Sequence, residues 1–109
     1  MDWINDVQRA INFMEAHLLE DVDAQDVSGY IHSSKDHFQK VFNIVTGLTV
    51  GEYVRNRRLS LAGEELRTSK IKVIDVAWKY RYESPESFAK AFSRFHGCAP
   101  SEARIEIRS

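Results

Sequence analysis

The 109-residue sequence has little cysteine and little proline: one cysteine and two prolines. Because Cys98 stands alone, no disulfide can form within the chain. No apolar run approaches the ~18 residues that a membrane span requires. The first ten residues, MDWINDVQRA, carry acidic side chains where a signal peptide needs basic residues and then an apolar stretch. These absences predict a cytoplasmic chain that does not enter a membrane.

The sequence also lacks the residue spacings that mark a catalytic or metal site. It has four histidines, and none forms an H-x-x-x-H or H-x-x-C ligand pair within one helix. No phosphate-binding glycine loop, G-x-S-x-G turn or paired-carboxylate motif appears. We therefore predict no enzyme, no catalytic residue, no metal site and no cofactor.

Basic residues are scarce in the first third of the chain. Residues 1–32 hold seven acidic residues and one basic residue, whereas residues 33–109 hold fourteen basic and nine acidic residues. The net charge of −1 thus hides a negative first third and a positive remainder. Such segregation is typical of a protein with a basic working face and an acidic outer element.

One fourteen-residue piece occurs twice. SKDHFQKVFNIVTG at residues 34–47 and SPESFAKAFSRFHG at residues 84–97 both read S-x-x-x-F-x-K-x-F-x-x-x-x-G. Upstream of each copy the similarity continues at an offset of 49, where Asp26 and Val27 match Asp75 and Val76. The repeated unit is therefore a short helix, a tight turn, a longer helix and a glycine stop.

The apolar periodicity predicts an all-α fold of about seven helices. The expected helices cover residues 3–19, 24–30, 34–46, 50–67, 73–80, 84–96 and 101–106. We expect N-caps at Asp23, at Ser33 or Ser34, and at Ser84, with Ser33 and Asp36 matching a capping box. Pro85 suits the first position of its helix, and Gly47 and Gly97 supply the left-handed residues that end the two repeats.

Each repeat has an apolar face and a polar face. The residues expected to be buried are Phe38, Val41, Phe42 and Val45 in the first copy, and Phe88, Ala91, Phe92 and Phe95 in the second. Trp3 and Trp78 are also interpreted as packing residues. The outward residues include Gln39 and Lys40 in one copy and Glu86 and Lys90 in the other.

A short helix, a turn and a second helix form the helix-turn-helix arrangement, whose second helix lies in the DNA major groove. Lys can bond guanine, Gln can pair with adenine, and Glu can accept from cytosine. The helix N-termini at Ser34 and Ser84 can bind phosphates through main-chain N–H groups. The alternative interpretation of these polar faces is that they are merely solvated.

The helix at 50–67 would be roughly 25 Å long at ~1.5 Å per residue. Recognition helices that bind one side of a duplex must lie ~34 Å apart. With side-chain offsets, a stiff helix of this length approaches that separation. One chain could then read two successive major grooves without forming a dimer.

The stretch VIDVAWKYRYESPESFAKAFSRFHGCAPSEAR, together with HFQKVFNIVTG and EYVRNRRLSLAGEEL, resembles the AraC/XylS family of bacterial transcription regulators. The resemblance implies one DNA-binding domain over 1–109, with helix-turn-helix subdomains at 3–48 and 70–109 and a connecting helix at 50–67. It also implies an asymmetric double-stranded promoter site, contact with RNA polymerase, and an effector domain elsewhere in a longer native chain.

The resemblance further implies roles for individual residues. The implied base readers are Asp36, Gln39 and Lys40 in the first motif and Pro85, Glu86, Ala89 and Lys90 in the second. The implied phosphate contacts are Ser34, Lys35, Arg57, Lys79, Arg81 and Ser84.

The sequence departs from the family pattern at both turns, where His32 and Arg81 replace glycine. A left-handed residue other than glycine costs roughly 1 kcal/mol, so we expect each turn to be distorted. Asp36 and Glu86 also place negative charge on both reading faces. These departures leave a second hypothesis open, a helical protein-interaction module that has lost DNA binding.

Overall fold

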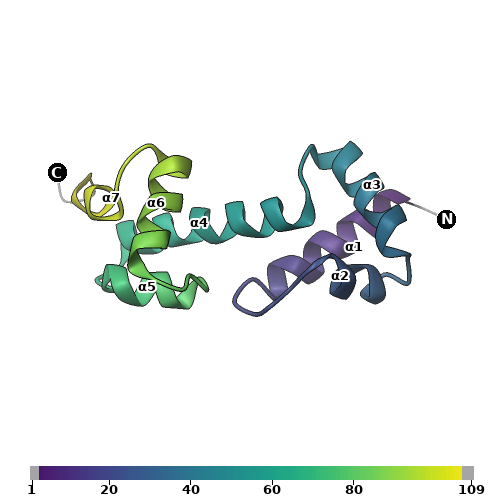
Figure 1. Ribbon diagram of the computed structural model, residues 1–109, viewed down its shortest axis with the longest axis horizontal. Coiled ribbons are helices and arrows are strands. Elements are labelled where there is room, and N and C mark those ends of the chain that lie inside the picture. The colour runs from purple at the N-terminus through teal and green to yellow at the C-terminus, as the bar shows by residue number, and fades with distance from the viewer. Residues whose placement is uncertain (1–2, 107–109) are drawn as a thin grey trace. The chain divides into compact units, whose positions relative to one another are not determined.

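The computed structural model describes residues 3–106, which form seven α-helices and no strand (Figure 1). The helices are α1 (Trp3–Ala16), α2 (Ala24–Tyr30), α3 (Lys35–Thr46), α4 (Val50–Thr68), α5 (Val73–Lys79), α6 (Pro85–His96) and α7 (Pro100–Glu106). The predicted all-α fold is confirmed. The extreme ends of the predicted 1–109 domain lie outside the described residues.

The helices belong to two compact units that meet between Arg55 and Asn56. This boundary falls inside α4, so the long helix contributes its first turns to one unit and its later turns to the other. Val54 is buried on the first side of the boundary, and Leu59 is buried on the second. The inner stripe predicted for this helix therefore exists, but its residues belong to two separate cores.

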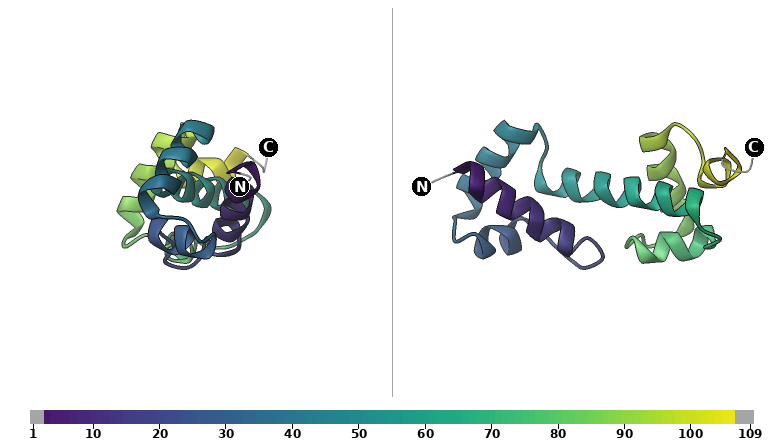
Figure 2. Two further views of the ribbon diagram at one scale, coloured as in Figure 1. Left: turned by 90° about the vertical axis from the view of Figure 1, so that its right-hand side faces the viewer. Right: turned by 180° about the vertical axis from the view of Figure 1, so that it is seen from behind.

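The first unit packs α1, α2 and α3 against one another, and α1 crosses α3 in the view from behind (Figure 2). Phe38 and Phe42 of α3 lie at its centre, with ring centroids 5.6 Å apart. Tyr53 of α4 meets Phe42 edge-on and donates its hydroxyl proton to Glu15 of α1 at 2.9 Å. Other buried side chains of the unit are Val7, Ala10, Met14, Leu18, Ala24, Val27, Ile31, Val50 and Val54.

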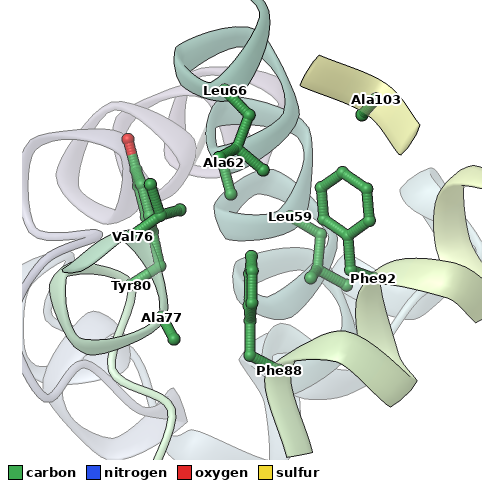
Figure 3. Packing of buried hydrophobic residues seen from close by; sticks show 9 residues of the cluster. All are labelled: Leu59, Ala62, Leu66, Val76, Ala77, Tyr80, Phe88, Phe92 and Ala103. Atoms are coloured by element: carbon green, nitrogen blue, oxygen red, sulfur yellow. The ribbon is translucent and has the colours of Figure 1, made fainter. Parts of the chain in front are cut away.

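The second unit has an equivalent core, drawn in Figure 3. Phe88 and Phe92 of α6 are fully buried and point toward Leu59 and Ala62 of α4. The remaining members of the cluster are Leu66, Val76, Ala77, Tyr80 and Ala103. The Phe pair of each repeat thus anchors its second helix, as the sequence predicts.

The ends of the helices follow from short-range hydrogen bonds. Asp23 and Asp26 form a reciprocal capping box at α2, in which the Asp26 amide donates to Asp23 Oδ1 at 3.0 Å and the Asp23 amide donates to Asp26 Oδ2 at 3.1 Å. At α3 the cap is Ser34, whose Oγ accepts from the His37 amide at 3.2 Å. The predicted capping box of Ser33 and Asp36 is therefore wrong. Ser33 precedes the cap, and its hydroxyl donates to the Ser34 carbonyl oxygen instead.

The two turns adopt the left-handed conformation at the predicted residues, with φ of 57° at His32 and 72° at Arg81. Their hydrogen bonds are regular: the Ser33 amide donates to the Ser28 carbonyl at 2.9 Å, and the Tyr82 amide donates to the Ala77 carbonyl at 3.0 Å. These are the six-to-one bonds of a Schellman helix end. The expected distortion of the turns is therefore wrong, because both residues accept the unfavourable φ and keep the turn geometry.

Four aromatic or apolar residues predicted to be buried are exposed instead. Trp3 is 53% exposed, Val45 45%, Trp78 51% and Phe95 44%. Val45 and Phe95 lie in the last turns of α3 and α6, beyond the part of each helix that the Phe pair anchors. Trp3 begins α1, and Trp78 lies on the side of α5 opposite the buried Val76.

Five other helices each differ from the prediction by one residue at one end, and the end of α1 differs by three residues. α1 ends at Ala16 rather than at residue 19, because the His17 and Glu20 amides bond to carbonyls only three residues back. α7 begins at Pro100, where the Ala99 amide donates to Glu102 Oε1 at 2.8 Å. Over residues 3–106, no helix is both long enough and apolar enough to cross a bilayer.

Candidate nucleic-acid interface

The outer face of α3 presents the three residues predicted to read bases in the first motif. Asp36, Gln39 and Lys40 are all exposed, and they stand at i, i+3 and i+4 on a helix whose opposite side buries Phe38 and Phe42. This spacing places them on one side of the helix. The face offers two amide or ammonium donors together with one carboxylate.

The outer face of α6 presents the same pattern, with differences in burial. Glu86 and Lys90 are exposed, whereas Pro85 and Ala89 are half-buried. Pro85 occupies the first helical position, where it has no N–H to donate. Glu86 and Lys90 are therefore the residues of this motif that can form polar contacts with base edges.

The serines at the starts of both helices serve as caps. Ser34 Oγ accepts from the His37 amide, and Ser84 Oγ accepts from the Ser87 amide at 3.1 Å. The Ser84 hydroxyl also donates to Ser87 Oγ at 3.1 Å. These bonds fix the directions of the helix N-termini, where positive partial charge favours a phosphate.

Lys79, one of the predicted phosphate contacts, is held by a carboxylate. Its ammonium forms an ion pair with Glu65 of α4, and the Tyr80 hydroxyl donates to the same Glu65 Oε1 at 2.9 Å. Burial, and then the hydrogen bond to Glu65, raise the pKa of Tyr80 to about 12. No local pattern predicts this cluster, because Glu65 lies 14 residues before Lys79.

Three further cations predicted to contact phosphate differ in their accessibility. Lys35 is exposed in the first turn of α3, and Arg81 is exposed in the turn before α6. Arg57 is half-buried in α4. Lys35 and Arg81 therefore lie close in sequence to the starts of α3 and α6.

One apolar side chain on the outer face of α3 was not singled out from the sequence. Ile44 is 82% exposed and follows Lys40 by one helical turn. It borders a groove lined by Trp3, Val41 and Val45. Its spacing from Lys40 could have revealed its position, but the periodicity alone did not show how exposed it is.

Arg104 of α7 connects this helix to the segment between α4 and α5. Its guanidinium donates to the main-chain carbonyl of Ser69 at 3.2 Å and to that of Ile71. Both carbonyls belong to the break between α4 and α5, so Arg104 holds the segment that leads into the helix-turn-helix. Among residues 3–106, no cluster of three or more His, Cys, Asp or Glu side chains is arranged to hold a metal ion.

Two successive units of short helix, left-handed turn and capped second helix define a double helix-turn-helix protein. A family described as a helix-turn-helix domain matches residues 27–105. The chain belongs to the AraC/XylS family of bacterial transcription regulators, as the resemblance in its sequence implies.

Two relatives match this chain over most of their own length. The HTH-type transcriptional activator AarP of Providencia stuartii is 35% identical over 99 residues, covering 91% of this chain and 73% of AarP. The regulatory protein SoxS of Salmonella typhimurium is 35% identical over 101 residues, covering 93% of this chain and 94% of SoxS. By contrast, the chain spans only 35% of the length of YbfP, an uncharacterized regulator of Bacillus subtilis.

Solved structures show the same fold. An AraC-type regulator from Chromobacterium violaceum superposes with a TM-score of 0.90 at 19% identity, covering 94% of this chain and 92% of that one. The DNA-binding domain of AdpA, solved in complex with a target DNA, superposes with a TM-score of 0.84 at 24% identity, covering 94% and 92%. At these identities the likeness concerns the fold alone.

Proposed function

We propose that this protein binds double-stranded DNA at specific sequences and thereby regulates transcription. The observation that carries the proposal is the repeated outer face: exposed charged residues stand at i and i+4 on α3, as Asp36 and Lys40, and fifty residues later on α6, as Glu86 and Lys90. A helix presented in this way fits the major groove. The names of the relatives agree, since AarP is a transcriptional activator and the AdpA domain was solved with its target DNA.

Each recognition helix would read bases through its polar residues. Gln39 and Lys40 match the donor and acceptor patterns of adenine and guanine, and Glu86 and Lys90 match those of cytosine and guanine. Asp36 would accept from a cytosine amino group, while Pro85 and Ala89 would give only close apolar contact. Since the two sets of residues differ, the chain would recognise an asymmetric site.

The two recognition helices would enter successive major grooves. α4 has 19 residues. A continuous helix of that length rises about 28 Å, which approaches the ~34 Å between neighbouring major grooves when side-chain reach is added. Phosphate contacts at Ser34, Lys35, Arg57, Arg81 and Ser84 would fix the register of the chain on the duplex.

Further partners of this site follow from the family. We propose that the bound chain contacts RNA polymerase and that an effector domain elsewhere in the native protein controls it. Because transcription takes place on the chromosome, the bacterial cytoplasm is the proposed location.

Selection of bound duplexes from a random pool, followed by titration of the enriched sequence, tests the proposal. Specific binding should weaken steeply as salt rises, because bound cations are released from the DNA. Lys40→Ala and Lys90→Ala should each cost about 1–3 kcal/mol of binding free energy. Lys70→Ala removes the same charge from the segment between α4 and α5, which belongs to neither recognition helix, and should cost much less.

Insertion of base pairs between the two halves of the enriched site tests the two-groove geometry. Five added base pairs turn one half-site by about half a helical turn, so a chain with a stiff α4 could hold only one half. Loss of affinity with five added pairs would agree with the proposal. Unchanged affinity would show that the units bind independently, and failure to enrich any duplex would favour the protein-interaction hypothesis.

A further inference from the structure

We propose that Ile44 is an additional sequence-reading residue, whose side chain contacts the C5-methyl group of a thymine in the groove that α3 occupies. The inference rests on the proposed DNA-binding function and assigns a base to a residue outside the polar set. At 82% exposed, Ile44 is the most exposed of the large apolar side chains that the structure describes, those of residues 3–104.

The position of Ile44 on α3 carries the first step. Asp36, Lys40 and Ile44 follow one another at intervals of four residues, so they rise along one side of the helix. Phe38 and Phe42 are buried on the opposite side. A duplex that Lys40 reads through its major groove would therefore lie against Ile44 as well, about 6 Å further along the helix axis.

The chemistry of Ile44 selects the base. In the major groove, guanine, cytosine and adenine present polar groups, and thymine adds a methyl group. An isoleucine side chain has no donor or acceptor, so it can discriminate only by burying that methyl group or by excluding a polar group. The groove beside it is lined by Trp3, Val41 and Val45, which keeps this flank of α3 apolar.

The second recognition helix differs at the equivalent place. The fifty-residue offset pairs Ile44 with Arg94, which is exposed near the end of α6. A guanidinium there would bind a phosphate or a guanine and would not sense a thymine methyl. The inferred contact therefore belongs to the half-site of α3 alone, and it adds to the asymmetry of the proposed site.

Deoxyuridine tests the inference, because it pairs as thymine does but lacks the C5-methyl group. The chain first selects its site from a random duplex pool, and Lys40→Ala then marks the half-site that α3 reads. Each thymine of that half-site is next replaced by deoxyuridine, one at a time. At one position we expect the affinity of the unaltered chain to fall roughly fourfold, the factor that burial of one methyl group gives.

Ile44→Ala should lower affinity for the thymine duplex by a similar factor and should no longer distinguish thymine from deoxyuridine. Ile44→Val, which keeps the branched carbon, should retain most of the discrimination. Val45→Ala, in the same groove, and Arg94→Ala, on the other helix, should retain all of it. Because Ile44 is exposed, circular dichroism should show unchanged folding for each variant at this position.

Two results would overturn the inference while leaving DNA binding intact. One is equal affinity for thymine and deoxyuridine throughout the half-site of α3. The other is persistence of the discrimination in Ile44→Ala, which would leave the apolar groove to a protein contact. Failure to select any duplex would instead overturn the proposed function, and this inference with it.

Discussion

The imidazole of His96, the last residue of α6, lies with Nε2 2.7 Å from the main-chain carbonyl oxygen of Leu59 in α4. The ring also packs on Phe92, with centroids 4.2 Å apart. The close approach of the ring to α4 depends on Gly63, since a Cβ there would lie 2.7 Å from His96 Cε1. The glycine in the middle of α4 therefore allows the end of α6 to pack closely against α4.

Gly63→Ala should not give the stability that alanine normally adds within a helix. The new Cβ must displace the His96 ring, which removes its bond to Leu59. The lost bond and contacts outweigh a propensity gain of up to ~1 kcal/mol, so we expect a net loss of about 1 kcal/mol in the free energy of unfolding. Urea denaturation followed by circular dichroism measures it.

Gly51→Ala is the matched control in the same helix. Its Cβ would meet only the end of the flexible Arg55 side chain, at 3.3 Å. We expect it to be stabilising by about 0.5 kcal/mol. Equal effects at the two glycines would show that His96 does not constrain the site.

His32→Gly should stabilise the first unit. His32 is exposed and has φ of 57°, a left-handed conformation that costs free energy in any residue other than glycine. Removing that cost should raise the free energy of unfolding by up to about 1 kcal/mol. Thermal unfolding measures the change. Gln25→Gly, at an ordinary exposed position of α2, should instead destabilise by about 1 kcal/mol, and a loss of stability at both positions would contradict the interpretation.

Tyr80 should make stability fall at high pH. Burial and the neighbouring Glu65 raise the pKa of Tyr80 from 10.0 to about 12, so the folded state holds the phenol proton more tightly than the unfolded state does. This contribution is fully present below pH 10 and is lost as the pH rises through about 12. Urea denaturation at several pH values between 9 and 12 tests it.

In Tyr80→Phe, the part of the alkaline loss due to this phenol should be absent, although the variant begins less stable because it lacks the bond to Glu65. Tyr30→Phe is the control, since Tyr30 is half exposed. If Tyr80→Phe and the unaltered chain lost stability in parallel, the raised pKa would not be the cause.

Glu65→Gln should increase the salt dependence of DNA binding. The carboxylate now neutralises Lys79, whereas an amide would still accept the Tyr80 hydroxyl but leave the ammonium free for a phosphate. One additional phosphate contact steepens the plot of log affinity against log salt by ~0.9. The double variant Glu65→Gln with Lys79→Ala should return to the original slope. An unchanged slope in the single variant would mean that Lys79 lies away from the DNA.

Local features of the sequence predicted the elements well. The bounds of α2, the cap at Ser84 and the left-handed Gly47 and Gly97 were all confirmed, because each depends on residues within one turn of the helix. The burial of Phe38 and Phe42 followed equally from their four-residue spacing. The cap at Ser34 rather than Ser33 shows the limit of this reasoning, since two adjacent serines fit the same pattern.

Contacts between distant residues could not be predicted in this way. Glu65 meets Lys79 and Tyr80, and Arg104 reaches Ile71, 33 residues earlier, only because the helices fold back on one another. The exposure of Trp3 was missed for a related reason: amphipathic spacing says which side of a helix is apolar but not where the neighbouring helices end.

The sequence by itself determined the repeat, the helices and the polar faces of α3 and α6, because these depend on spacing along a single helix. The tertiary structure decided which of those side chains are accessible and which are engaged. In the folded chain, Lys79 forms an ion pair with Glu65 and Ala89 is half-buried. Ile44, one helical turn after Lys40, is exposed. Burial and ion pairing depend on what packs across from a residue, and that is known only once the chain has folded.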